Sequence, residues 1–329
     1  MKKWLASLLS VVMLLSLAGC GTGGEEPPGS SDSSLPNVTI STGRQGAGML
    51  YPFSVAVAEA MKADGVIKNY TLTPSGNVGC PVLVSSGECQ IGWTSTECAW
   101  MAKTGQGIYD TVQSNIDLMA CTYPACLYVV TFEDNKEINS VADLVGKRVN
   151  VGAAGQVQNL LSTCLMEAAG YSLDDLTEAN TLSLGDAVEE MKNGNLDAMI
   201  IYNSMPLSSI MELNTSRQIK LVPMDEETLA NLQERVPVLV ETNYKAEDTY
   251  DGITEDYHSV GSDGCIIVSA DLDEDLVYQM TKSYAEHYPE LQGTIAALSD
   301  IDVSAICPEV NGLEYHPGAL RYYEEQGWR

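Results

Sequence analysis

The sequence predicts an α/β fold of two lobes that together hold a ligand site. Strand-like and helix-like segments alternate from residue 37 onward, as in proteins with a mostly parallel sheet. Two strand–glycine–helix units, at 40–52 (ISTGRQGAGMLYP) and 149–161 (VNVGAAGQVQNLL), would each direct backbone N–H groups toward a site that favours negative charge. A weak internal repeat, between 83–93 and 191–201, indicates two lobes of a common plan.

The first 36 residues are expected to lie outside the fold. A basic start, an apolar stretch and residues 17–20 (LAGC) indicate a secretory signal peptide over 1–19. The tetrapeptide resembles the bacterial lipobox, which implies a lipid on Cys20. A membrane span is disfavoured because the apolar run is shorter than the roughly 20 residues that cross a bilayer. Residues 20–36 then comprise the lipidated cysteine and a flexible Gly/Ser/Pro-rich tether, so the chain is expected to be exported and membrane-anchored.

The charge of the chain excludes some partners. Its formal net charge is −28, and loss of residues 1–19 removes two lysines and no acid, leaving −30. Such a charge opposes binding to nucleic acid and gives no long-range attraction for anions, so an anionic solute would need local compensation. No Cys-x-x-Cys spacing occurs and only three histidines are present, so neither a metal site nor a cofactor is expected.

The first part of the chain is expected to form one βα series. Helical spacing of apolar residues begins at Leu50 and continues to Met61. A second helix begins at Asn77, a plausible N-cap, and ends at Gly87. The expected strands are 37–41, 70–73, 90–93 and 117–132, the last as one or two strands with a break at Tyr123-Pro124, and a third helix spans 97–103.

The second series begins near Ser140 and Asp143, whose spacing resembles a capping box. Strands are expected at 148–151, 198–202, 218–223 and 265–269, and helices at 157–168, 186–193, 226–233 and 273–288. The strand at 265–269 would return the chain to the first lobe. The predicted division is therefore 37–128 plus 262–329 for lobe 1, and 129–261 for lobe 2.

Eight cysteines other than Cys20 leave two alternatives open. They are either small buried hydrophobic residues or members of one or more disulfides, whose pairing the sequence does not determine. The cysteines and the three histidines also permit a thiol–imidazole enzyme. No cysteine lies in a nucleophile-like turn, so the chain is not expected to be an enzyme.

Several motifs between residue 37 and the C-terminus share an order and spacing with a known family. They are Thr42-Gly43 with Gly46, Tyr51 and Pro52; 86–88 (SGE) before 90–92 (QIG); Tyr123-Pro124; 143–149 (DLVGKRV); 194–198 (GNLDA); and 316–319 (HPGA) with Tyr322-Tyr323. The chain thereby resembles the TAXI family of solute receptors, the extracytoplasmic subunits of TRAP-type transporters. The resemblance implies a type II periplasmic-binding-protein-like fold with a ligand cleft between lobes, a solute such as an amino acid or a dicarboxylate like glutamate, and a membrane permease as partner.

Two departures from the family leave the solute open. Leu50 replaces one of two adjacent tyrosines, and 152–156 (GAAGQ) replaces a Gly-Ser-Gly-Thr loop. Receptors for ABC importers and sensor lipoproteins share the same plan and remain alternatives. Neighbouring genes would separate these classes.

The candidate ligand residues follow the carboxyl ends of strands, where open α/β sheets bind ligands. Arg44 is the preferred carboxylate ligand, with a solvated loop arginine as its alternative. Arg148 begins a strand and should face the opposite end. The other candidates are Gln45, Gly46, Tyr51, Asn77, Thr94, Ser95, Thr96, Gly155, Gln156, Gln158, Tyr202 and Asn203. Capping is the alternative role for Asn77, Ser95 and Thr96, and burial in the core is the alternative for Tyr51 and Tyr202.

Overall fold

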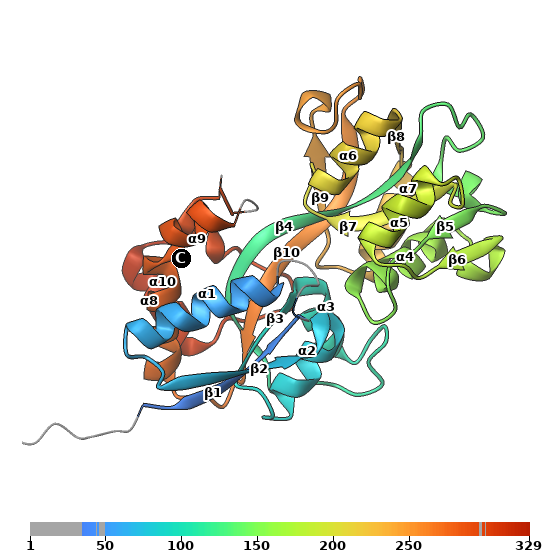
Figure 1. Cartoon of the computed structure of the whole chain (residues 1–329). Helices are drawn as coiled ribbons and strands as arrows, with labels where there is room; N and C mark the ends of the chain where they lie inside the picture. The colour runs from blue at the N-terminus through green and yellow to red at the C-terminus, as the bar shows by residue number, and fades with distance from the viewer. Residues whose placement is uncertain (1–34, 44, 46–49, 296–297, 300) are drawn as a thin grey trace, which may run out of the picture. The chain divides into compact units, whose positions relative to one another are not determined.

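The computed structural model describes residues 35–43, 45, 50–295, 298–299 and 301–329 (Figure 1), and residues from 35 onward form one compact unit. Its strands form one sheet in the order β2-β1-β3-β10-β4-β7-β5-β6, with β8 beside β4 and β9 beside β10. The strands are β1 (Asn37–Thr42), β2 (Asn69–Pro74), β3 (Ile91–Ser95), β4 (Asp117–Phe132), β5 (Arg148–Asn150), β6 (Glu178–Asn180), β7 (Ala198–Asn203), β8 (Ile219–Val222), β9 (Val240–Tyr244) and β10 (Tyr257–Val268).

Helices connect these strands. They are α1 (Leu50–Ala63), α2 (Gly76–Ser85), α3 (Thr96–Thr104), α4 (Val157–Ala168), α5 (Leu184–Lys192), α6 (Ser208–Ser216), α7 (Glu226–Arg235), α8 (Glu274–Glu286), α9 (Tyr288–Thr294) and α10 (Pro317–Gln326). Short 3₁₀ turns occupy Val141–Leu144, Leu173–Asp175, Ala246–Asp248 and Val303–Ile306. Among the described residues, no helix is both long enough and apolar enough to cross a membrane.

The sheet contains two parallel groups of strands. In the first, β1 pairs in parallel with β2 and β3, and β10 pairs antiparallel with β3. In the second, β5 pairs in parallel with β6 and β7, and β4 pairs antiparallel with β7. Because parallel strands end at the same edge, each group brings its strand-to-helix turns together.

The long strands β4 and β10 pair with each other and thereby join the two groups (Figure 1). Their partners change near the pair formed by Cys126 and Gly261. A Cβ on Gly261 would lie 2.2 Å from the Ala125 carbonyl oxygen, so only glycine allows this close approach. The predicted lobe boundaries at 128/129 and 261/262 fall inside these continuous strands, and the exact division stays a prediction.

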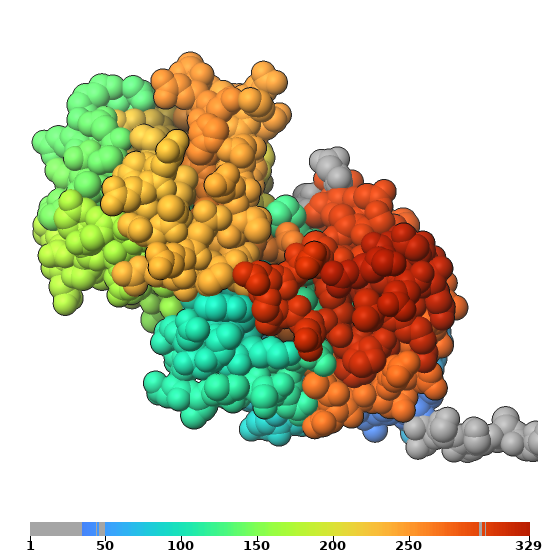
Figure 2. Space-filling view, turned by 180° about the vertical axis from the view of Figure 1, so that it is seen from behind, coloured from blue at the N-terminus to red at the C-terminus, as the bar shows by residue number. Residues whose placement is uncertain are grey.

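The C-terminal segment packs on the elements that begin the chain. From behind, the C-terminal helices, in red, lie with the cyan segment around α2 and α3, whereas green to amber residues gather in the other lobe (Figure 2). The Phe53 ring of α1 contacts Trp93 of β3 and Tyr284 of α8, edge to face, at 5.9 and 6.2 Å. On the other face of β3, Gly92 lies against Cys80 of α2, where a Cβ would approach the sulfur to 2.2 Å. Helices therefore cover both faces of this strand.

Most of the predicted elements are confirmed within one to three residues. Residues 117–132 form one continuous strand through Tyr123-Pro124. The expected strand at 265–269 is the end of the longer β10, and the expected helix at 273–288 is two helices, α8 and α9.

Two capping predictions are wrong. Helix α2 begins at Gly76, after Ser75, so Asn77 lies inside its first turn and is not the N-cap. The Ser140 side chain makes no cap hydrogen bond; its hydroxyl donates to Asp143 Oδ2 at 3.0 Å. A capping box does form further on, between Ser172 and Asp175.

The structure decides between the two cysteine alternatives. All eight cysteines of the described chain are free thiols, and every one except Cys164 is buried. Burial raises the pKa of Cys80 and Cys126 to about 12. The thiols therefore act as small core residues.

Candidate functional site

Hydroxyl groups fix the turns at the ends of the first-lobe strands. At the end of β1, Thr42 Oγ1 lies 2.6 Å from Ser54 Oγ and donates to the Leu50 carbonyl oxygen at 3.2 Å. The Ser41 hydroxyl is hydrogen-bonded to that of Ser75, which precedes α2. These contacts tie the end of β1 to the starts of α1 and α2.

The turn between β5 and α4 is fixed by side-chain amides. Gly152 has a φ of +88°, and a Cβ there would lie 2.7 Å from Gln158 Cγ, so glycine is required. Gln158 Nε2 donates to the Ile200 carbonyl of β7 at 2.6 Å, and Asn159 Nδ2 donates to the Gly152 carbonyl at 3.3 Å. The Gln158 side-chain amide therefore anchors this turn to β7 within the second lobe.

The turn before α2 in the first lobe contacts the turn before α4 in the second lobe. The Cβ position of Gly76, at the start of α2, lies 3.4 Å from Gln156 Nε2 and 3.9 Å from the Gly155 carbonyl oxygen. Gly76 has a φ of +69°, and both Gly155 and Gln156 are exposed. The described partner of the 149–161 turn is thus the β2–α2 turn.

Both helices that begin at this contact have N-termini without a side-chain cap. Ser75 precedes α2 and Gln156 precedes α4, and neither side chain bonds to the N–H groups of its helix. The first N–H groups of a helix have no intrahelical partner and carry partial positive charge. Two helix ends that can attract an anion therefore start at the same contact between the lobes.

The remaining predicted residues have mixed positions. Arg44 and Gly46 lie outside the described residues, as does Cys20. Gln45 is exposed, and Tyr51 is half-buried in the first turn of α1.

Three other candidates have structural partners or are buried. Thr94 Oγ1 donates to the Asn77 carbonyl at 2.7 Å, which ties β3 to α2. Asn203 Oδ1 accepts the Ser204 N–H at 2.9 Å within its own turn. Thr96 is the first residue of α3 and is only 2% exposed.

A buried polar cluster, which sequence reasoning missed, connects the two groups of strands. The Ser262 hydroxyl of β10 donates to Glu97 Oε2 of α3 and lies 2.8 Å from the Tyr202 hydroxyl of β7. Burial raises the pKa of Glu97, and the hydroxyls of Ser262, Ser95 and Tyr202 beside it work in the opposite direction. The available signal was Glu97 itself, a single acid directly before the apolar run 98–102.

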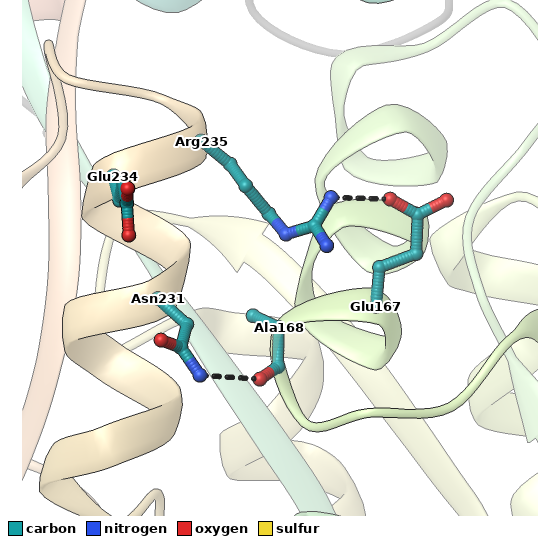
Figure 3. Close-up of a pocket in the computed structure, with 5 residues that line it drawn as sticks. All are labelled: Glu167, Ala168, Asn231, Glu234 and Arg235. Carbon is teal, nitrogen blue, oxygen red and sulfur yellow. Dashed lines mark hydrogen bonds and ion pairs between the residues drawn. The ribbon is translucent and has the colours of Figure 1, made fainter.

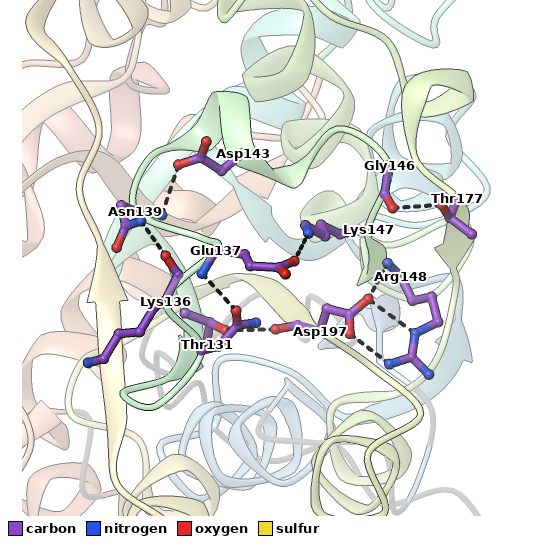
Figure 4. Close-up of polar contacts among 11 residues, drawn as sticks. Thr131, Lys136, Glu137, Asn139, Asp143, Gly146, Lys147, Arg148, Thr177 and Asp197 are labelled. Atoms are coloured by element: carbon purple, nitrogen blue, oxygen red, sulfur yellow. Dashed lines mark hydrogen bonds and ion pairs between the residues drawn. The ribbon is translucent and has the colours of Figure 1, made fainter.

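Arg148 forms an ion pair with Asp197 (Figure 4). Its Nε and Nη2 atoms donate to Asp197 Oδ2 and Oδ1 at 3.1 and 2.6 Å, a two-pronged contact at the start of β5. The contact holds the pKa of the Asp197 carboxyl below its usual range. Arg148 is committed to this pair and is not available to a solute between the turns.

Two surface hollows lie away from the strand ends. One, of about 440 Å³, lies between α4 and α7 (Figure 3). Arg235 Nη1 contacts Glu167 Oε2 at 2.8 Å there, and Asn231 Nδ2 donates to the Ala168 carbonyl at 3.1 Å, so these residues tie the two helices together. The other, of about 730 Å³, is lined by Lys103, 309–315, Leu320 and Arg329. Neither contains a predicted ligand residue, and the described part of the chain holds no group of three His, Cys, Asp or Glu suited to a metal.

Comparisons with known proteins agree with this architecture. A model of the NMT1-like family matches residues 40–327. A solved structure of a protein from Bordetella bronchiseptica RB50 superposes with a TM-score of 0.53 at 16% identity, covering 88% of this chain and 98% of that one. XAC2383 from Xanthomonas citri, bound to chloride ion, gives a TM-score of 0.51 at 12% identity, covering 88% and 95%. The expected two-lobed α/β fold of the type II periplasmic-binding-protein kind is confirmed.

Proposed function

Because this chain belongs to the NMT1-like family, which is a solute-binding family, we propose that it is a receptor that closes on a small carboxylate-bearing solute. The observation that carries the proposal is the approach of Gly76 to Gln156, from separate lobes. A solute held there would touch both lobes at once. Contacts divided in this way favour the closed arrangement only when the solute is present.

The chemistry of the contact favours a carboxylate. The uncapped N-terminal ends of α2 and α4 both begin there, and they offer backbone N–H donors. They also supply the local attraction that a chain with a net charge of −28 lacks at long range. Arg44, which lies outside the described residues, is the side chain we expect to add a guanidinium to the same anion.

We further propose that the receptor is exported, anchored through a lipid on Cys20, and delivers its solute to the membrane subunits of a TRAP-type transporter. The basic and apolar start of the chain and residues 17–20 support export and lipidation. The motif resemblance to the TAXI family supports the choice of transporter. A flexible tether over 21–36 would keep the receptor concentrated near its permease.

A binding screen tests the receptor role. Protein comprising residues 37–329 is heated with single amino acids, dicarboxylates and keto acids, and hits are measured by titration calorimetry. A true solute raises the melting temperature with concentration, because binding to the folded state alone stabilises it. A panel in which no compound shifts the melting temperature would refute the proposal for these solute classes.

Two experiments test anchoring and partner. The Cys20→Ser variant should lose labelling by radioactive palmitate and leave the membrane fraction, whereas a variant that stays labelled would refute the anchor. In proteoliposomes that hold a permease encoded by a neighbouring gene, uptake of the solute should require the receptor and an ion gradient but no ATP. Uptake driven by ATP would assign the protein to an ABC importer.

A further inference from the structure

Three buried polar atoms at the end of β3 have no hydrogen-bond partner among the described residues. They are Trp93 Nε1, Ser95 Oγ and Glu97 Oε1. Their residues are 1%, 4% and 0% exposed, and alternate residues of a strand share one face, so Trp93 and Ser95 point the same way. Buried polar atoms in native proteins are normally paired, so three in succession indicate a place where a polar partner binds.

The charge around Glu97 is also unbalanced. The neighbours that act on its carboxyl are the hydroxyls of Ser262, Ser95 and Tyr202, and no described Lys, Arg or His pairs with it. A buried acid is ordinarily paired with a cation or kept neutral. One carboxyl oxygen of Glu97, Oε2, accepts a hydrogen bond from Ser262. The other oxygen, Oε1, can accept a hydrogen bond from a cationic donor.

The position of Glu97 connects it to the site between the lobes. It lies in the first turn of α3, directly after β3, at the same edge of the sheet as the turn that carries Gly76. Tyr202 of β7, in the other lobe, reaches the same cluster through Ser262. Because both lobes enclose the carboxyl, a ligand would reach it when they separate and be covered when they close.

We propose that Ser95 Oγ and Glu97 Oε1 form an acceptor subsite for the ammonium group of the solute, which makes the solute class amino acids in place of simple dicarboxylates. The inference rests on the proposed receptor function and extends it. The two helix N-termini receive the carboxylate, and the buried acceptors receive the ammonium group. A zwitterion satisfies both sets of groups, whereas a dicarboxylate leaves Glu97 without a partner and brings a second negative charge toward it.

Matched ligand pairs that differ only in the amino group test the subsite. The pairs are L-glutamate with glutarate, L-leucine with 4-methylpentanoate, and L-alanine with propionate, each titrated calorimetrically into residues 37–329. At least one amino acid should bind about tenfold or more tightly than its partner, because a charge-assisted hydrogen bond is lost without the amine. If the partner of every binding amino acid binds equally well, the subsite is refuted while the receptor function stands. If no member of any pair binds, the receptor function itself fails for these solutes.

Variants locate the effect. Glu97→Gln keeps the size of the side chain and an oxygen for Ser262 but removes the charge, and it should weaken binding of the amino acid about tenfold or more while leaving the desamino partner unchanged. The matched control is Glu88→Gln, an exposed acid of the same lobe, which should change neither. Ser95→Ala provides an independent test if Glu97→Gln does not fold, and it should weaken only the amino acid. A variant that weakens both members of a pair equally would show a structural role and overturn the subsite.

Discussion

Replacing Gly76 by leucine tests whether the two turns meet around the solute. Gly76 and Gly65 share a φ of +69°, where any side chain is strained, so Leu at either position should cost about 1–3 kcal/mol of the free energy of unfolding. Their surroundings differ. A Cβ at Gly65 has no atom within 4 Å, whereas a Cβ at Gly76 lies 3.4 Å from Gln156 Nε2 and 3.9 Å from the Gly155 carbonyl oxygen.

The expected outcome separates strain from the contact between lobes. The Cβ of Gly76→Leu already stands at van der Waals distance, so the remaining side-chain atoms must displace the Gln156 amide and hold the turns apart. Because the two positions share the same φ, urea unfolding should give similar losses in the free energy of unfolding for Gly76→Leu and Gly65→Leu. Titration of a solute found in the screen should give about tenfold weaker binding, or about 1.4 kcal/mol, for Gly76→Leu alone. Equal affinity of the two variants for that solute would refute the idea that the turns close on it.

Three further predictions concern other residues. Arg44→Ala, outside the described residues, should abolish the melting-temperature shift with any carboxylate hit while leaving the unliganded melting temperature nearly unchanged; an undiminished shift would remove Arg44 from the site. Asp197→Asn should lower the free energy of unfolding at pH 7 by about 1 kcal/mol, since its pair with Arg148 is partly exposed. Because Arg148 holds the pKa of Asp197 below 3.8, that difference should vanish in urea titrations as the pH falls through the folded pKa, and a difference that persists there would contradict the pairing. Iodoacetamide at pH 8 should leave the seven buried thiols of native residues 37–329 largely unmodified and label all eight thiols in urea, because burial raises the pKa of Cys80 and Cys121 to about 12. Rapid labelling of more than one thiol in the native protein would contradict the burial of the seven.

The sequence alone determined the local elements and the class of fold. The apolar stripe of 157–168 and the apolar run before Thr42 set a helix and a strand through interactions that each segment makes with its own neighbours. Alternation of such segments favours an α/β fold whatever the distant contacts are. The capping prediction at Asn77 failed because α2 begins one residue earlier, and the prediction at Ser140 failed because its side chain makes no hydrogen bond to the N–H groups of the turn; residue spacing alone fixes neither outcome.

Only the tertiary structure decided which turns meet and which polar groups are buried. Gly76 and Gln156 are 80 positions apart in the chain, and Glu97 and Ser262 are 165 apart, so neither contact leaves a periodic signal. The sequence also left the eight thiols between two states, and packing decided that they are free. Strand register brings distant residues together, and it is set by the whole sheet at once, which is why the site is a property of the fold and not of any one segment.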